Sequence, residues 1–227
     1  MTNLRRKGRS LADATLTISS KNYSSWSLRG WLLTKFSGLP FTENVISADD
    51  PSMRDELLLL SSSFLVPSLI HNGISIWDTL AIGEYLNEIK PEAHLLPADP
   101  VKRTRCRSIC GEMHSGFGAM RSALPMNLHG DFPNFKVWKR AQADIDRITT
   151  IWRECLDLSG GPFLLGARSM ADAMYAPVVT RFLTYHVKLD SVSEAYCKEI
   201  MALPEMIQWI EAAKQEPRQM EELEVEF

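Results

Sequence analysis

Apolar and polar residues alternate at period two over residues 14–19, and this alternation predicts a short strand. Apolar side chains then recur at helical spacing, which predicts a helix from about 25 to 37. Gly38 follows this helix as a C-cap glycine would. The junction between the strand and the helix is the polar stretch Asn22–Arg29, which places three serines where the helix begins.

The same alternation of strand and helix patterns continues to about residue 92. Further strands are expected at 41–46, 66–71 and 74–77, and further helices starting near 49–51 and at 78–79. Asn72–Gly73 is the strongest two-residue hairpin signal and joins the last two strands. The order β-α-β-α-β-β-α predicts a small mixed sheet with helices on its faces.

From Val101 onward the strand patterns stop. Helices are expected over about 101–123, 135–158, 170–187, 192–202 and 204–215, separated by proline and glycine breaks. A proline-bearing linker lies around 91–100. The expected organisation is a disordered leader at 1–13, an α/β domain at 14–92, an all-helical domain at 101–217 and an acidic tail at 218–227.

The composition is that of an ordinary globular protein, with 45% hydrophobic and 23% charged residues. A net charge of −3 predicts no attraction to nucleic acid or to an anionic membrane. No apolar run has the length of a membrane span, and no signal-peptide core follows Met1. We therefore expect a cytoplasmic protein, with the basic cluster Arg5–Arg9 as part of a frayed terminus.

The four cysteines form no C-x-x-C pair, which is typical of a reducing compartment. Cys106, Cys110 and His114 share one helical face. Three ligands along one helix cannot surround a tetrahedral zinc ion, so we expect a core-facing stripe and no metal.

The serine-rich turn suggests chemistry with an anion. A helix N-terminus gathers amide and hydroxyl donors and favours negative charge, so it would stabilise a thiolate or a carboxylate. The alternative is simple capping, in which Ser24 or Ser25 satisfies helix amides.

Four motifs, in this order and spacing, resemble the cytosolic glutathione transferases. Ser24–Arg29 is similar to the S-S-x-S-x-R motif of the serine-type zeta class, although that class has cysteine at the third position. Val66–Pro67 stands where the family carries a cis-proline before a hairpin. Asp78–Thr79 replaces the usual Glu-Ser or Gln-Ser, and Ser169–Asp172 resembles the S/T-x-A-D box. The resemblance covers about Thr15–Pro217.

The resemblance implies a thioredoxin-like N-terminal domain, an all-helical C-terminal domain and a homodimer. It implies a transferase that uses glutathione as cosubstrate against a small electrophile, with isomerase or peroxidase side activity and a role in detoxification. The alternative is a non-catalytic module that uses the same fold for binding or assembly.

The resemblance also implies roles for individual residues. Ser24 would donate a hydrogen bond to the glutathione sulfur, with Ser25 as the alternative donor. Arg29 would add positive potential or serve as an interface residue.

Glutathione itself would be held by the other two motifs. The backbone of Val66, before a cis Pro67, would pair with the cysteinyl part as an added strand does. The Asp78 carboxylate would face the γ-glutamyl ammonium, and the Thr79 hydroxyl would face its carboxylate.

The electrophile would bind between the two domains. Apolar residues at helical spacing on the first helix of the second domain would line its pocket, opposite Trp26. They are Met113, Phe117 and Met120.

Overall fold

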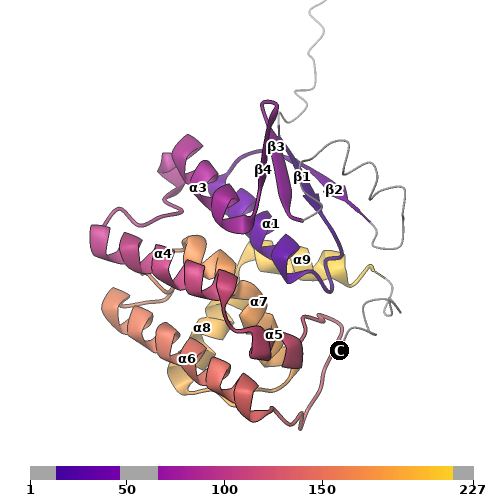
Figure 1. Cartoon of the computed structure of the whole chain (residues 1–227), viewed down its shortest axis with the longest axis vertical. Helices are drawn as coiled ribbons and strands as arrows, with labels where there is room; N and C mark the ends of the chain where they lie inside the picture. The colour runs from indigo at the N-terminus through magenta and orange to yellow at the C-terminus, as the bar shows by residue number, and fades with distance from the viewer. Residues whose placement is uncertain (1–13, 47–65, 217–227) are drawn as a thin grey trace, which may run out of the picture.

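A computed structural model of the chain describes residues 14–46 and 66–216, and contains a sheet with the strand order β2-β1-β3-β4 (Figure 1). The strands are β1 (Ala14–Ile18), β2 (Thr42–Val45), β3 (Ser68–His71) and β4 (Ile74–Trp77). β2 runs parallel to β1, whereas β3 is antiparallel to both β1 and β4. Asn72 and Gly73 have φ values of 51° and 78°, the left-handed geometry of the predicted hairpin turn.

In the part of the chain that the structure describes, two helices accompany the sheet, α1 (Ser25–Ser37) and α3 (Thr79–Ile89). α1 coincides with the predicted helix and ends at Gly38, whose φ of 71° is the conformation that glycine adopts most easily. Almost all residues of α1 are buried, because it lies between the sheet and the helical part of the chain (Figure 1). The expected helix near residues 49–51 lies outside the described residues, as do the leader at 1–13 and the tail at 218–227.

Within the described residues, the elements from Pro100 to Ala213 are all helices, and they follow a short 3₁₀ turn, η1 (Pro91–Ala93). The helices are α4 (Pro100–Ser115), α5 (Gly118–Ala123), α6 (Lys139–Ser159), α7 (Met170–Thr184), α8 (Ser191–Met201) and α9 (Pro204–Ala213).

Three of the helix predictions were wrong in their limits, and α7 is one of them, since it ends at Thr184 and not at 187. The single helix expected over 101–123 is divided between α4 and α5, because Gly116 is extended and Phe117 has a φ of 58°. Neither conformation can continue an α-helix. α6 begins at Lys139, four residues later than expected.

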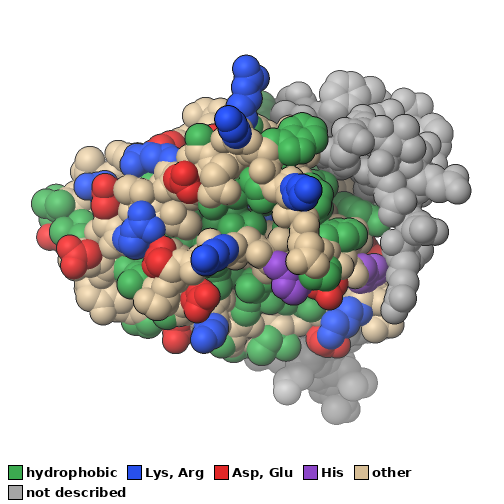
Figure 2. Space-filling model, turned by 90° about the horizontal axis from the view of Figure 1, so that it is seen from below, with side chains coloured by type: hydrophobic (Ala, Val, Ile, Leu, Met, Phe, Trp, Pro, Cys, Tyr) green, Lys and Arg blue, Asp and Glu red, His purple; other side chains and the backbone are tan. Residues whose placement is uncertain are grey.

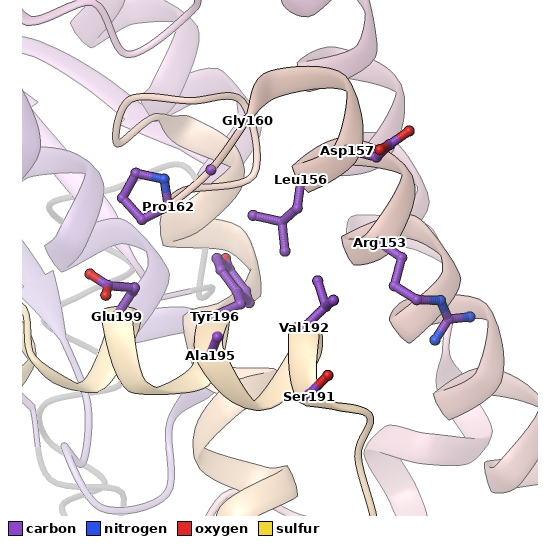
Figure 3. Close-up of a pocket in the computed structure, with 11 residues that line it drawn as sticks. Arg153, Leu156, Asp157, Gly160, Pro162, Ser191, Val192, Ala195, Tyr196 and Glu199 are labelled. Atoms are coloured by element: carbon purple, nitrogen blue, oxygen red, sulfur yellow. The ribbon is translucent and has the colours of Figure 1, made fainter.

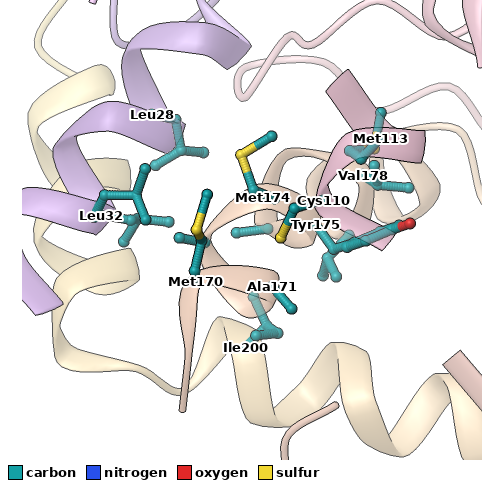
Figure 4. Packing of buried hydrophobic residues seen from close by; sticks show 14 of the residues in the cluster. Leu28, Leu32, Cys110, Met113, Met170, Ala171, Met174, Tyr175, Val178 and Ile200 are labelled. Carbon is teal, nitrogen blue, oxygen red and sulfur yellow. The ribbon is translucent and has the colours of Figure 1, made fainter. Parts of the chain in front are cut away.

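α7 is the central helix of the fold, packed against α1 on one side and α4 on the other. Figure 4 shows Met170 and Met174 of α7 pointing toward Leu28 and Leu32 of α1. The buried apolar residues form one continuous cluster that joins the sheet part to the helical part. Cys106 and Cys110 are buried within it, as predicted, whereas His114 of the same predicted stripe is partly exposed and contacts Asp78.

The surface carries charges of both signs. On the face shown in Figure 2, acidic and basic side chains are interspersed, with apolar side chains between them. None of the helices within residues 14–46 and 66–216 combines the length and the apolar character that crossing a membrane requires.

Candidate active site

The sheet register brings two helix N-termini to the same edge. Thr17, near the end of β1, pairs with Ser68 at the start of β3, and Ser68 pairs with Trp77 at the end of β4. α1 follows β1 and α3 follows β4, so both helices begin at this edge. Their N–H groups and dipoles favour an anion between them.

The Val66–Pro67 peptide bond, at the same edge, is cis, as expected. Pro67 packs directly on α1: a Cβ added at Gly30 would lie 2.6 Å from Pro67 Cβ. Glycine at this position therefore lets the ring seat against the helix. The hydroxyls of Ser68 and Thr79 are buried nearby without a hydrogen-bond partner among the described residues, which leaves two donors for a ligand.

Ser24 caps α1 and belongs to a small network of serine hydroxyls. Its Oγ accepts from the Ser27 N–H at 3.3 Å and donates to Ser27 Oγ at 2.9 Å. Ser27 Oγ in turn accepts from the Ser19 N–H at 3.0 Å. Capping and the proposed donor role are therefore compatible, because Ser24 is half-buried at the helix entrance while Ser27 lies beneath it.

The other two predicted residues of the serine motif differ in burial. Ser25 is the first residue of α1 and is 7% exposed. Arg29 is completely buried, and its Nε donates to the Met174 carbonyl of α7 at 2.8 Å. Its Nη1 and Nη2 have no hydrogen-bond partner among the described residues. Arg29 is thus an interface residue that still carries two unpaired donors.

Asp78 precedes α3 and meets a residue of the helical part. Its Oδ1 accepts from the Leu80 N–H at 2.8 Å, which caps the helix. Its Oδ2 lies 2.5 Å from Nε2 of His114 on α4. Thr79, the next residue, is 1% exposed. The acceptor expected for the glutathione ammonium is therefore shared with a histidine.

The indole of Trp26 connects these groups. Its ring lies 5.2 Å from the His114 ring and 4.5 Å from the Arg29 guanidinium carbon. The Arg121 guanidinium carbon of α5 lies 5.7 Å from the same ring. Trp26 is only partly buried, so it is available to a ligand at this boundary.

The three residues predicted to line the electrophile pocket are buried. Met113 and Met120 have no exposed surface, and Phe117 is 7% exposed. In this structure, Met113 and Met120 belong to the core beneath the site, while Phe117 stands at the break between α4 and α5.

Arg29, Arg121 and Arg181 form a cluster of positive charge. Burial, followed by the charges of Arg181 and Arg121, holds the pKa of Arg29 well below its ordinary value. Burial and Arg121 lower the pKa of Arg181 to about 10. Within residues 14–46 and 66–216, none of the three pairs with a carboxylate. The positive charges of the three arginines are therefore not balanced by a paired carboxylate among the described residues.

Four residues of this region were missed as site residues by the sequence analysis. Ser27 belongs to the serine motif and could have been found from it. His114 was noticed only as part of a cysteine stripe. Arg121 carries no local signal, because the fold alone brings it to Trp26. Arg181 lies on the helix that follows the S/T-x-A-D box, but its register there did not assign it a role.

A surface cavity of about 640 Å³ lies elsewhere, between the end of α6 and α8. Figure 3 shows Leu156, Val192 and Pro162 facing it, while Arg153 and Glu199 point away. It shares no residue with the serine turn and has a mainly apolar lining, so it does not suit a charged peptide such as glutathione.

The comparisons with known proteins agree with the geometry. The N-terminal domain family of glutathione S-transferase matches residues 23–89. Maleylacetoacetate isomerase of Rattus norvegicus is 32% identical over 147 residues, which are 64% of this chain and 67% of the relative. The enzyme of the same name from Mus musculus is 31% identical over 70% of this chain and 74% of its own length.

Solved structures agree on the fold. A glutathione transferase homologue from Burkholderia GL BGR1, with bound glutathione, has a TM-score of 0.68 at 20% identity over 89% of this chain and 98% of its own. Glutathione transferase Omega 3C from Trametes versicolor has a TM-score of 0.67 at 20% identity, over 87% and 88%. The chain has the two-part architecture of a glutathione transferase. It belongs to the glutathione S-transferase family, and its relatives support a glutathione-dependent transferase or isomerase function.

Proposed function

We propose that the protein binds glutathione at the edge where α1 and α3 begin and activates its thiol for attack on, or isomerisation of, a small electrophile. The observation that carries the proposal is the convergence of two helix N-termini on the cis Val66–Pro67 bond. This arrangement offers backbone groups for a peptide and positive potential for a thiolate.

In the proposed complex, the Val66 backbone pairs with the cysteinyl part of glutathione. The γ-glutamyl carboxylate meets the unpartnered Thr79 hydroxyl and the first amides of α3. The γ-glutamyl ammonium meets Asp78. Because Oδ2 of Asp78 already contacts His114, the ammonium shares this oxygen with the histidine or displaces it.

The thiol needs activation, because a cysteine thiol has a pKa of about 8.5 and is mostly protonated at neutral pH. Ser24 supports the thiolate by donating its hydroxyl to sulfur instead of to Ser27. The proton of the thiol leaves to solvent, and the N-terminus of α1 adds favourable potential. Ser25 remains the alternative donor. The thiolate sulfur then forms a bond to an electrophilic carbon. In a substitution the electron pair of the broken bond departs with the leaving group; in an addition the π electron pair moves to the neighbouring atom, which takes a proton from solvent; and in an isomerisation that pair returns after bond rotation and expels the sulfur.

The arginine cluster favours an electrophile that carries a carboxylate. Arg29 carries two unpaired Nη groups beside Trp26, and Arg181, whose charge acts on Arg29, carries an unpaired Nε. An anionic substrate would supply the missing negative charge. The two isomerase relatives act on maleylacetoacetate, whose name marks it as a carboxylic acid.

Arg121→Gln tests this substrate class, because Arg121 is the least buried of the three. We expect kcat/KM for maleylacetoacetate to fall roughly tenfold, since one charge-assisted contact is lost. Conjugation of the neutral probe 1-chloro-2,4-dinitrobenzene should change less than about twofold. Arg105→Gln, which breaks an exposed ion pair with Glu154, is the matched control. If Arg121→Gln loses activity equally with both substrates, the result would contradict the proposal of an anionic electrophile.

We further propose a cytoplasmic homodimer in which the sheet part of one chain packs against the helical part of the other. The four free cysteines suit a reducing compartment. Sedimentation at micromolar concentration should give twice the chain mass of 25.7 kDa. A single species at the chain mass would exclude the dimer.

Retention on immobilised glutathione tests the proposed function as a whole. We expect the protein to be retained and to be eluted by free glutathione, and Asp78→Asn to be retained less. A wild-type protein that passes straight through would contradict glutathione binding. A retained protein that turns over neither electrophile would instead favour a non-catalytic module.

A further inference from the structure

The turn that precedes Ser24 is held by the far end of the chain. Glu216 follows α9, and its N–H donates to the Ala213 carbonyl at 3.0 Å, so that its backbone is fixed to the end of the helix. Its carboxylate reaches back to residues 20–22, 194 to 196 positions earlier in the sequence. The last described residue of the chain therefore lies beside the serine turn.

The Glu216 carboxylate accepts three hydrogen bonds from three successive residues. Oε2 accepts from the Ser20 hydroxyl at 2.7 Å and from the Asn22 N–H at 3.1 Å. Oε1 accepts from the Lys21 N–H at 2.6 Å. Bonds to a charged acceptor are roughly twice as strong as neutral ones, and two of these donors are backbone groups. The carboxylate therefore fixes the path of the main chain here.

Ser20 transmits this restraint to Ser24. The Ser20 carbonyl accepts from the Ser24 N–H at 3.0 Å, and its hydroxyl accepts from the Tyr23 N–H at 3.1 Å. Ser20 is thus bound to Glu216 on one side and to the first residues of the serine motif on the other. Only one residue separates the carboxylate from the residue proposed to bind sulfur.

Other contacts place α9 beside the same turn. Nε1 of Trp209 on α9 donates to the Lys21 carbonyl at 2.8 Å. Asn22 is fully buried, and its Oδ1 accepts from the His129 N–H at 3.0 Å. These contacts hold the middle of the turn, whereas Glu216 also holds Ser20, the residue bonded to Ser24.

We propose that Glu216 is a positioning residue for thiol activation, which acts by holding the turn at residues 20–22 so that Ser24 and the N-terminus of α1 face the sulfur. This inference rests on the proposed function. A hydrogen bond to a thiolate depends steeply on its geometry, so loosening the turn weakens the bond without removing Ser24. A simple structural role would change stability but would leave the pKa of the bound thiol unchanged.

Glu216→Gln in the full chain is the main variant. The amide preserves shape and one acceptor, but it presents an N–H₂ group to one of the backbone donors. Ser20→Ala is the second variant, because it removes the hydroxyl that donates to Glu216 and accepts from the Tyr23 N–H, without a change in charge. Glu211→Gln is the matched control, since the exposed Glu211 pairs only with Lys214 in the described structure.

Two measurements distinguish a positioning role of Glu216 from a purely structural role. Without glutathione, the Lys21 and Asn22 amides should exchange with solvent deuterium at least about tenfold faster in Glu216→Gln than in wild type or Glu211→Gln. With glutathione, the pKa of the bound thiol should rise by about one unit in Glu216→Gln and Ser20→Ala. The rate of conjugation should then return to the wild-type value at a pH above the shifted pKa.

Either of two results would overturn the inference: wild-type amide protection in Glu216→Gln, or an unchanged thiol titration in variants that still bind glutathione. A wild-type protein that binds no glutathione would contradict the proposed function first. The amide exchange would still show whether the Glu216 contacts hold the turn.

Discussion

The carboxylate of Asp78 and the imidazole of His114 meet 2.5 Å apart, across the boundary between the sheet part and the helical part of the chain. Asp78 precedes α3 and His114 lies in the last turn of α4, so the contact ties the predicted glutathione site to the helices that carry the predicted electrophile site. The packing of His114 on Trp26 extends the link to the start of α1. A substitution on either side of the boundary should therefore affect ligand binding at both predicted sites.

Asp78→Asn should weaken glutathione binding roughly tenfold or more, because the ammonium loses its counter-charge while the amide oxygen still caps α3. Isothermal titration with glutathione measures the effect. Asp99→Asn is the control, because Asp99 caps α4 through a single backbone N–H in the same way and is exposed. Equal affinities in the two variants would argue against an ammonium site at Asp78.

Gly30→Ala should destabilise the protein by about 1–3 kcal/mol, because the new Cβ would overlap the rigid Pro67 ring. Glutathione affinity should fall as well, since Pro67 fixes the Val66 backbone. Gly111→Ala, in α4, meets nothing within 4 Å and should stabilise by about 0.5–1 kcal/mol. Chemical denaturation of both variants checks the prediction, which fails if the two free energies of unfolding change alike.

Asp172→Asn should lower the free energy of unfolding by about 2–3 kcal/mol. The buried carboxylate of Asp172 accepts from the N–H groups of Leu164 and Ser169 and from the hydroxyls of Ser169 and Tyr196. An amide can satisfy only part of this set. Asp190→Asn, at the exposed cap of α8, should cost about 1 kcal/mol. If urea denaturation gives similar losses of unfolding free energy for Asp172→Asn and Asp190→Asn, then burial adds nothing to the contribution of Asp172.

The same carboxyl predicts a dependence of stability on pH. Burial raises the pKa of Asp172 to about 6, although its hydrogen bonds act in the opposite direction. The pKa of Asp172 is about 4 in the unfolded chain and higher in the folded protein. At a pH between these two values, the folded protein therefore binds the proton of Asp172 more tightly than the unfolded chain does. This contribution, on the order of 3 kcal/mol, is present at low pH and is lost as the pH rises through 6.

Urea midpoints measured from pH 4 to 7 test this dependence. The stability of the wild-type protein relative to Asp172→Asn should decline across the window and become constant above it. A constant difference between the two proteins would mean that Asp172 titrates alike in the folded and unfolded chains.

Local sequence was sufficient for most of the described fold. The limits of α1 and β4 were predicted from spacing, a C-cap glycine and a hairpin pair. The break at Gly116–Phe117 was not predicted, because phenylalanine is not a helix-breaking residue and its left-handed conformation is imposed by its surroundings. Secondary structure was thus predictable where one short stretch determines it.

The residues of the candidate site likewise fall into those that local motifs predict and those that only the fold brings together. Ser24, Pro67 and Asp78 belong to local motifs, and the structure brings their segments to one edge of the sheet. His114, Arg181 and Glu216 could not be assigned from the sequence, because each comes from a segment far along the chain and no local pattern indicates its contact with the site. Whether a buried charge such as Arg29 is paired or unpaired is likewise a property of the packed fold.

The central claim is that the Ser24 hydroxyl stabilises the thiolate of bound glutathione. Ultraviolet titration of the thiolate in the complexes of wild type, Ser24→Ala and Ser25→Ala tests it directly. We predict that only Ser24→Ala raises the pKa of the bound thiol substantially, by about one to two units, which corresponds to about 1.5–3 kcal/mol for a lost charge-assisted hydrogen bond. A wild-type titration in Ser24→Ala together with a shifted titration in Ser25→Ala would contradict the claim.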